Sequence, residues 1–441
     1  MEDPGGLGDR VQPDRVSFTV KATGEKIPKN PLFQLELRCE NQTAVQAEIK
    51  LSDRSVTKAH EVAGRLCEVR ALGGNKFVLG QEVAFTIRQG EDVLTRRVIY
   101  PQDGEGEVIS TDFFAPHGEL QVEVSHEFTG KPLGTRLRVM TWNILHGGRD
   151  AGGETNVRQI GEFIRNQDPD VLVTVETYGS GNRILDVMNA GQPPDRLYKG
   201  IQITREPGQE VNRDNLWIFT RFPVVKLYPL HRERIHSLHF GGVRIRLPDN
   251  QEMNVFATWL YQLEHAGSYT NKTVNEIRAG TPRTYTDEEI VGTDKKRLEW
   301  MNIIQKTFLP LYLNGDKAPT IMAGDFNTLS NQDWSRRFAH APGHAGLVLD
   351  WPVTKAMQEA GFTDSYRWAN PDASRFQGRT TNPLAGYGTS PSRIDYIWTS
   401  GDSVRILDSF TRDRRLPEHS SAHLFYSDHA PVITDMMIRH P

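Results

Sequence analysis

Apolar and polar residues alternate in several short segments of the first 130 residues. The alternation is clearest at 16–20, 33–37, 83–87 and 120–124. A period of two is that of a half-buried strand, because successive side chains point to opposite faces of a sheet. Short strands separated by glycine-containing breaks predict a small β-sandwich at 15–130. The preceding residues, 1–14, are rich in glycine, proline and aspartate and are expected to form a disordered lead.

After a linker at 130–135, strand patterns mix with helical ones. Apolar residues recur every three to four positions at 156–167, 295–308 and 353–360, which predicts helices. Apolar runs predict strands at 137–142, 171–175, 216–219, 243–247, 253–258, 320–322, 394–398, 404–407 and 432–436. This mixture predicts an α+β domain with a large sheet core at 136–441. The long polar connection at 262–293 is expected to be a substrate-facing loop, since structureless loops of that length usually bind something.

Acidic, amide and imidazole side chains stand at the ends of several of these strands. They are Asn143, Glu176, Asp325 with Asn327, Asp395, and Asp428 with His429. Such groups are costly to bury without partners. If the strands share one sheet edge, the groups converge there and a divalent cation is the natural neutraliser.

The residue types indicate how such a site would work. Glu176, Asp428 and Asn143 offer oxygens, which suit Mg²⁺ or Mn²⁺, with Ca²⁺ also compatible. His429 titrates near neutrality, and a carboxylate partner would fix its tautomer and raise its pKa. Asp325 can orient or deprotonate a water, and the preceding Gly324 lets the backbone turn closely beside a ligand.

Five segments in this order carry a family resemblance. They are Asn143, Glu176, Gly324-Asp325-Phe326-Asn327, Arg393-Ile394-Asp395-Tyr396-Ile397 and Ser427-Asp428-His429-Ala430-Pro431. Together they resemble the endonuclease/exonuclease/phosphatase superfamily, the deoxyribonuclease-like metal-dependent phosphoesterases. The resemblance runs from about residue 135 to the end. It implies a four-layer α/β/β/α sandwich, with two mixed sheets face to face and helices outside.

The resemblance also implies roles for these residues. Glu176 would be the principal metal ligand, aided by Asn143 and Asp428. Asp325 would position or activate the attacking water, and Asn327 would hold that water or a phosphate oxygen. His429 would contact the phosphate or act as general acid or base, with Asp395 fixing its ring. Whether His429 or Asp325 is the base stays open at this point.

One position departs from the family pattern. Many members carry a histidine in a Thr-His-Leu-like triplet, whereas this chain has Thr258-Trp259-Leu260. His265, Tyr261 or His146 could take over the missing contact, or each could be an ordinary surface residue.

Two further side chains are weaker substrate candidates. Arg183 follows a Gly-Ser-Gly turn and could bind phosphate, or be a solvated loop arginine. Asp214 precedes a strand where the family often places substrate-facing groups.

Composition narrows the substrate and the compartment. The net charge is −4, so no basic field favours sequence-independent binding of nucleic acid, although nucleic acid stays among the candidate substrates. No apolar run is long enough to span a membrane. The start lacks the apolar region of a signal peptide, so the chain is either cytosolic or a processed extracytoplasmic form, which the domain order favours. Cys39 and Cys67 either pair or remain two buried thiols.

The sequence therefore predicts a divalent-metal-dependent phosphodiesterase that hydrolyses a P–O bond by in-line water attack. Its substrate is nucleic acid, a small phosphodiester or another phosphorylated compound. A hydrolase like sphingomyelinase or phospholipase C, and a non-enzymatic binding protein on the same scaffold, are the alternatives.

Overall fold

The computed structural model divides the chain into two compact units, 1–133 and 134–441, which are described separately. The described residues are 15–440 without 24–31, 40–41, 51–54, 60–65, 73–80, 100–107, 115–118, 129–132, 231–233, 384–390 and 420–423. The lead expected at 1–14 lies outside them.

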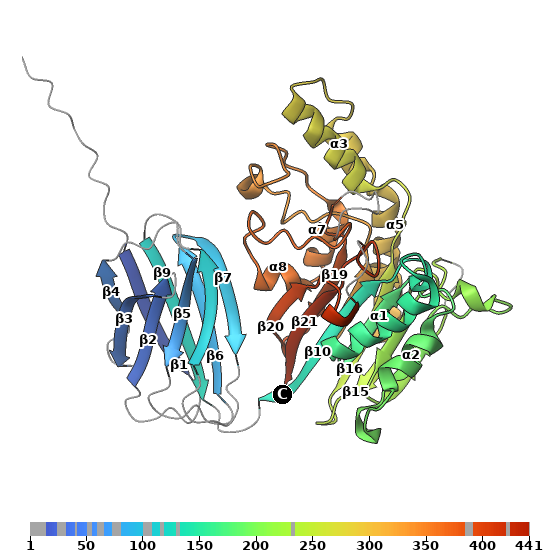
Figure 1. The fold of residues 1–441 in the computed structure, drawn as a ribbon, viewed down its shortest axis with the longest axis horizontal. Helices are drawn as coiled ribbons and strands as arrows, with labels where there is room; N and C mark the ends of the chain where they lie inside the picture. Colours follow the sequence, from blue (N-terminus) through green and yellow to red (C-terminus); the bar gives the residue numbers. More distant parts are fainter. Residues whose placement is uncertain are drawn as a thin grey trace, which may run out of the picture. The chain divides into compact units, whose positions relative to one another are not determined.

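The first unit consists of two β-sheets that share one core (Figure 1). One sheet has the order β4 (Ser55–Ala59), β1 (Arg15–Thr23), β9 (Glu119–Phe128), β6 (Gln81–Gln89), β7 (Asp92–Ile99). The other has the order β3 (Gln42–Lys50), β2 (Leu32–Cys39), β5 (Leu66–Leu72), β8 (Val108–Phe114). Alternate residues such as Val16, Phe18 and Val20 point into the core, as the period of two predicts. Cys39 and Cys67 are cross-strand partners of β2 and β5 and form a disulfide.

The second unit contains two six-stranded mixed sheets. The first runs β12 (Lys199–Gln202), β13 (Trp217–Thr220), β11 (Val171–Val175), β10 (Gly134–Asn143), β21 (Val432–Arg439), β20 (Val404–Thr411). The second runs β14 (Val224–Leu227), β15 (Phe240–Arg246), β16 (Glu252–Trp259), β17 (Thr320–Asp325), β19 (Asp395–Ser400), β18 (Thr363–Asp364). Inward residues of both sheets, among them Val173, Val255 and Ile321, form one core between them.

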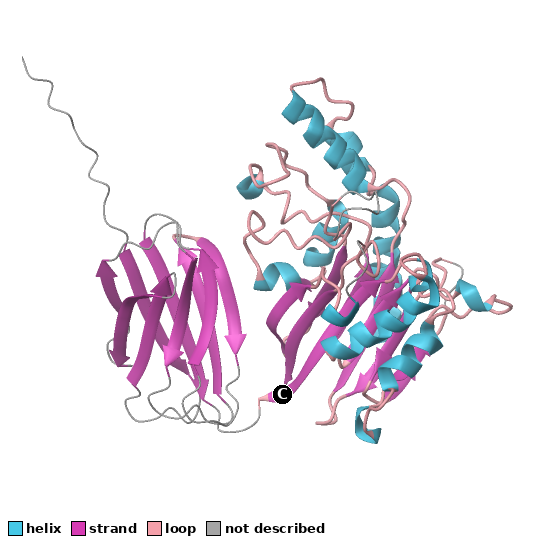
Figure 2. Cartoon of the chain, viewed as in Figure 1, coloured by secondary structure: helices cyan, strands magenta, loops and turns pink. Residues whose placement is uncertain are grey.

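Helices cover the outer faces of these sheets (Figure 2). On the first sheet pack α1 (Gly153–Gln167) and α2 (Gly181–Asn189), through residues such as Ile160 and Phe163. On the second pack α5 (Lys295–Ile303), the π-helical turn at 304–308, α6 (Leu309–Leu313) and α7 (Pro352–Glu359). A short helix, α8 (Ser365–Ala369), follows β18. The α+β fold predicted from the sequence is confirmed. One core lies between the two sheets and one lies between each sheet and its helices, so the layers are helix, sheet, sheet and helix.

The stretch at 262–293 is not the structureless loop that its polarity suggests. It folds into α3 (Ala266–Ala279) and α4 (Asp287–Gly292), and α3 projects from one end of the unit (Figure 1). Thr286 caps α4 in a capping box with Glu289, and this Thr-x-x-Glu pattern is a helix start signal that is visible in the sequence. Among the described residues, no helix combines the length and apolar character that a membrane crossing requires.

Candidate active site

The polar strand ends meet where the two sheets face each other. The parallel strands β10 and β11 end at Asn143 and just before Glu176, and the parallel strands β16 and β17 end at Trp259 and Asp325. Asp395 begins β19 directly opposite Asp325 in the antiparallel register. Parallel neighbours bring their carboxyl ends to one sheet edge, so the predicted convergence follows from the topology.

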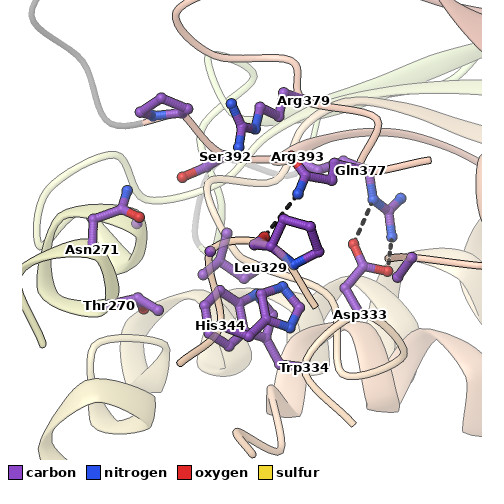
Figure 3. Close-up of a pocket in the computed structure, with 15 residues that line it drawn as sticks. Thr270, Asn271, Leu329, Asp333, Trp334, His344, Gln377, Arg379, Ser392 and Arg393 are labelled. Atoms are coloured by element: carbon purple, nitrogen blue, oxygen red, sulfur yellow. Dashed lines mark hydrogen bonds and ion pairs between the residues drawn. The ribbon is translucent and has the colours of Figure 1, made fainter. Parts of the chain in front are cut away.

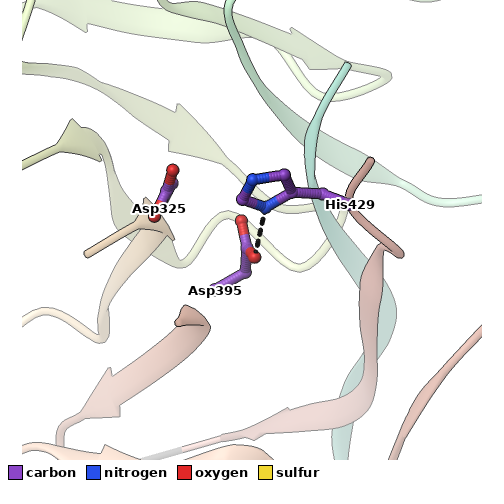
Figure 4. A group of neighbouring side chains, drawn as sticks. All are labelled: Asp325, Asp395 and His429. Carbon is purple, nitrogen blue, oxygen red and sulfur yellow. Dashed lines mark hydrogen bonds and ion pairs between the residues drawn. The ribbon is translucent and has the colours of Figure 1, made fainter. Parts of the chain in front are cut away.

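A buried trio forms the deepest part of this region: Asp325, Asp395 and His429 (Figure 4). The Nδ1 atom of His429 lies 2.7 Å from Oδ2 of Asp395. Burial alone would lower the pKa of His429, but the carboxylates of Asp395 and Asp428 outweigh it and raise that pKa well above its usual range. This direction favours the imidazolium form of His429, whose Nδ1–H donates to Asp395.

The surroundings of Asp325 change its ionisation. Burial, followed by the charge of Asp395, raises the pKa of Asp325 to about 7. Its Oδ1 accepts a hydrogen bond from the backbone N–H of Asn327 at 2.8 Å. Asn327 has a left-handed φ of +53° and donates its amide to the carbonyl of Leu260. A carboxyl with a pKa near the working pH has the acidity expected of a general base.

Glu176 and Asn143 form the more open side of the region. The amide of Asn143 donates to Oε1 of Glu176 at 3.0 Å and to Oδ2 of Asp325 at 3.2 Å, so it links the two carboxylates. The second oxygen of Glu176 accepts from the backbone N–H of His146. The side chains of Glu176 and Asp428 are 14% and 13% exposed, and a ligand can therefore reach them from solvent.

One cavity of about 340 Å³ collects these groups. Its polar lining includes Asn143, Glu176, Asp325, Asn327, Asp428 and His429, with Asp395 behind His429. No lysine or arginine is among its described lining residues. Four carboxylates with only one imidazolium leave a strong negative charge when all are ionised. This donor chemistry, oxygen-rich and short of cations, fits a divalent metal ion.

The conformation of Glu176 is held by side chains that follow the next strand-end loop in the sequence, at 214 and 215. Its φ is +57°, a conformation that costs energy for a residue with a side chain. The side chain of Asn215 accepts from the backbone N–H of Glu176 and donates to the carbonyl of Leu238. Asp214 accepts from the N–H of Gly179 and from the indole of Trp217. Asp214 thus braces the loop after β11, and it does not line the cavity that collects the strand-end groups.

A buried ion pair fixes the approach to α3, and sequence reasoning missed it. Arg297 is fully buried, pairs with Asp294, and donates to the carbonyls of Tyr261, Leu263 and Glu264. The sequence contains one indication of this burial: Arg297 is a charged residue directly beside Leu298, on a helix that packs against the core. By holding 261–264, Arg297 places His265 at the N-terminal cap of α3, where His265 lines the cavity.

The other histidine candidates and Trp259 have different surroundings. Trp259 lines the cavity, belongs to the core between the sheets and stacks on His239. Its indole N–H is buried without a hydrogen-bond partner among the described residues. His146 is exposed and bonds Asp150. Arg183 is exposed on α2 and does not line the cavity, so the structure does not bring it to the site.

Comparison with known proteins identifies relatives of the second unit. Residues 140–429 match the model of the Endonuclease/Exonuclease/phosphatase family. An uncharacterized protein of Caenorhabditis elegans is 27% identical over 320 residues, which are 68% of this chain and 90% of that protein.

Two solved structures illustrate the similarity. A truncated TDP2 of Caenorhabditis elegans is 17% identical, with 68% of this chain and 97% of that chain covered and a TM-score of 0.44. A mannosyl-6-phosphatase of Bacteroides thetaiotaomicron is 16% identical, with 68% and 99% covered and a TM-score of 0.42. Because the family model matches about two thirds of the chain and spans the residues that line the cavity, this protein belongs to the endonuclease/exonuclease/phosphatase family of phosphoesterases.

Proposed function

We propose that the protein is a divalent-metal-dependent phosphodiesterase that hydrolyses a P–O bond by in-line attack of water. The observation that carries the proposal is the composition of the cavity, where carboxylates and amides surround one imidazolium and lysine and arginine are absent from the described lining. A phosphodiester is an anion that repels both these carboxylates and a nucleophile, so it reacts there only when cationic groups neutralise it.

Glu176, Asp428 and Asn143 would hold the metal ion. Their oxygens are hard ligands that suit Mg²⁺ or Mn²⁺, and Ca²⁺ has the same preference. The bound cation would neutralise a non-bridging oxygen of the phosphate. The trio of Asp325, Asp395 and His429 also lies close enough together to hold a cation, but a protonated His429 has no lone pair to offer one.

The chain's own residues divide the remaining work. Asp325, with a pKa of about 7, takes a proton from the attacking water as the new P–O bond forms. His429, held as an imidazolium by Asp395, gives its proton to the departing oxygen as the other P–O bond breaks. Asn327, next to Asp325 in the cavity, offers an amide that orients the water or a phosphate oxygen.

The test uses bis(p-nitrophenyl) phosphate and plasmid DNA with the purified protein. Magnesium should support hydrolysis of at least one of them, and EDTA should abolish it. Asp325→Ala and His429→Ala should each reduce kcat by at least about a hundredfold. Matched controls are Asp186→Ala and His340→Ala, which truncate exposed residues of the same types. Activity that survives EDTA or both active-site substitutions would refute the mechanism.

We further propose that the first unit, 15–130 in the sequence-based division, is an accessory domain of an extracytoplasmic enzyme. The Cys39–Cys67 disulfide supports this compartment, because disulfides persist in oxidising surroundings. Alkylation and mass spectrometry of protein isolated without reductant from its native source should recover the linked pair, whereas free thiols there would argue against this compartment.

A further inference from the structure

A second, smaller pocket adjoins the active-site cavity and has a different chemical character (Figure 3). We call it the side pocket. Thr270 and Asn271 of α3, Trp334, His344, Arg379 and Arg393 line it. Gly267 and Ser392 line both pockets, so the two are contiguous beside the first turn of α3.

One short backbone segment joins the two pockets. Thr381 lines the active-site cavity and forms an antiparallel bridge with His429. The N–H groups of Thr380 and Thr381 both donate to the carbonyl of Ser392, and the N–H of Ala430 donates to the carbonyl of Thr380. Arg379 lies two residues before Thr381 and lines the side pocket, so this segment runs from the side pocket to the edge of the active site.

The charges around the side pocket leave one unpaired cation. Asp333 is buried between Arg367 and Arg393, at 2.9 Å from each, and Arg393 also bonds Asp364 at 2.7 Å. These two carboxylates and two guanidiniums neutralise each other. Arg379 is exposed and has no ion-pair or hydrogen-bond partner among the described residues. Burial lowers the pKa of His344, which is neutral at pH 7. The described residues that line the side pocket therefore carry a net positive charge, opposite to that of the active-site cavity.

The size of the side pocket limits what it accepts. Its volume of about 70 Å³ holds several water molecules. Asn271, Thr270 and Ser392 are polar residues of the lining, while Trp334 and His344 stack face to face with centroids 4.0 Å apart (Figure 3). A compact anion that accepts several hydrogen bonds suits these dimensions, whereas an apolar chain would leave the polar groups unpaired.

We propose that the side pocket binds a second phosphate of the substrate, with Arg379 as its counter-ion, while the scissile phosphodiester occupies the active-site cavity. The inference rests on the proposed phosphodiesterase function. It narrows the substrate to a phosphodiester that carries another phosphate a few bonds away. A nucleic acid strand and a small phosphorylated diester both have this chemistry.

The test compares matched pairs of chromogenic diesters. One pair is the p-nitrophenyl ester of thymidine 5′-phosphate with and without a 3′-phosphate. The other is p-nitrophenyl 2-methoxyethyl phosphate and the analogue that carries a phosphate in place of the methoxy group. The added phosphate should raise kcat/KM, chiefly by lowering KM. Arg379→Gln should reduce this gain about tenfold, the value of one charge-assisted hydrogen bond. A gain in both pairs indicates recognition of phosphate alone, and a gain only in the nucleotide pair indicates a nucleic acid strand.

Arg278→Gln is the matched control. Arg278 is an exposed arginine in the last turn of α3, and its substitution removes the same charge at a place outside the side pocket. This variant should keep the full gain. No gain in the wild-type protein, or an equal gain in Arg379→Gln, overturns the inference while leaving the phosphodiesterase function intact. If no diester is hydrolysed, the proposed function fails, and calorimetry with thymidine 3′,5′-bisphosphate then tests whether the side pocket binds phosphate. An affinity about tenfold weaker in Arg379→Gln than in the wild-type protein supports phosphate binding there. Equal affinity in the two proteins refutes it.

Discussion

Gly324 supports Asp325 through the packing of two strands, which makes Gly324→Ala an informative substitution. Gly324 has a φ of +145°, and a Cβ built on it would lie 1.9 Å from the carbonyl oxygen of Thr258 on the neighbouring strand β16. The sequence suggested that this glycine lets the backbone approach a ligand. The close approach is instead to β16, whose last residue, Trp259, pairs with Asp325.

The size of the perturbation follows from this geometry. Real Cβ atoms essentially never approach an atom within 3.0 Å, so β16 and β17 must separate by about 1 Å at the alanine. The positive φ costs about 1–3 kcal/mol for alanine, and each weakened ladder hydrogen bond adds about 1 kcal/mol. We expect a loss of about 3 kcal/mol in the free energy of unfolding. A displacement of Asp325 by about 1 Å lowers kcat/KM about a hundredfold.

Urea unfolding followed by tryptophan fluorescence measures the stability, because all eight tryptophans lie in the second unit. Hydrolysis of bis(p-nitrophenyl) phosphate measures activity. Gly315→Ala is the matched control, since Gly315 also has a positive φ of +77° but has no atom within 4 Å of its Cβ position. It should cost about 1 kcal/mol and leave kcat/KM unchanged. A Gly324→Ala protein as stable and as active as Gly315→Ala would refute the reasoning.

Two further predictions concern the first unit. The Cys39→Ser/Cys67→Ser double variant should lose about 3.6 kcal/mol of stability, because the disulfide closes a 28-residue separation. Hydrogen exchange in β2 and β5 peptides should show the loss, and unchanged protection there would contradict it. Burial lowers the pKa of His126 to about 3, against about 6.5 unfolded, so stability is lost as pH falls below 6.5 and continues to fall towards 3. Hydrogen exchange of β9 peptides, corrected for intrinsic exchange rates, should show a loss of about 2 kcal/mol in stability at pH 5. His126→Gln should abolish this pH dependence. If the variant keeps the same pH dependence, His126 is not its source.

The sequence was most informative where local pattern and burial coincide. The period of two around Val16–Val20 and the helical face at 156–167 both match observed elements, because each segment buries one side. Sequence reasoning failed where tertiary contacts decide the structure. Arg297 holds 261–264 through carbonyl groups that only the fold brings within reach. Arg379 and the side pocket were likewise invisible, since their lining comes from segments over a hundred residues apart.

The replacement of the expected histidine by Trp259 narrows the choice of proton donor. An indole N–H is too weak an acid to act as a catalytic proton donor at any working pH, and Trp259 is packed in the core between the sheets. Two histidines line the cavity. Burial, and then the charge of Arg297, lower the pKa of His265, so it is neutral at pH 7 and a poor acid donor there. In the mechanism that we propose, His429 is therefore the group that would give a proton to the departing oxygen. An enzyme with one protonated donor stabilises a basic alkoxide leaving group less well than an enzyme with two. We therefore expect kcat to be higher for substrates whose leaving groups are more acidic.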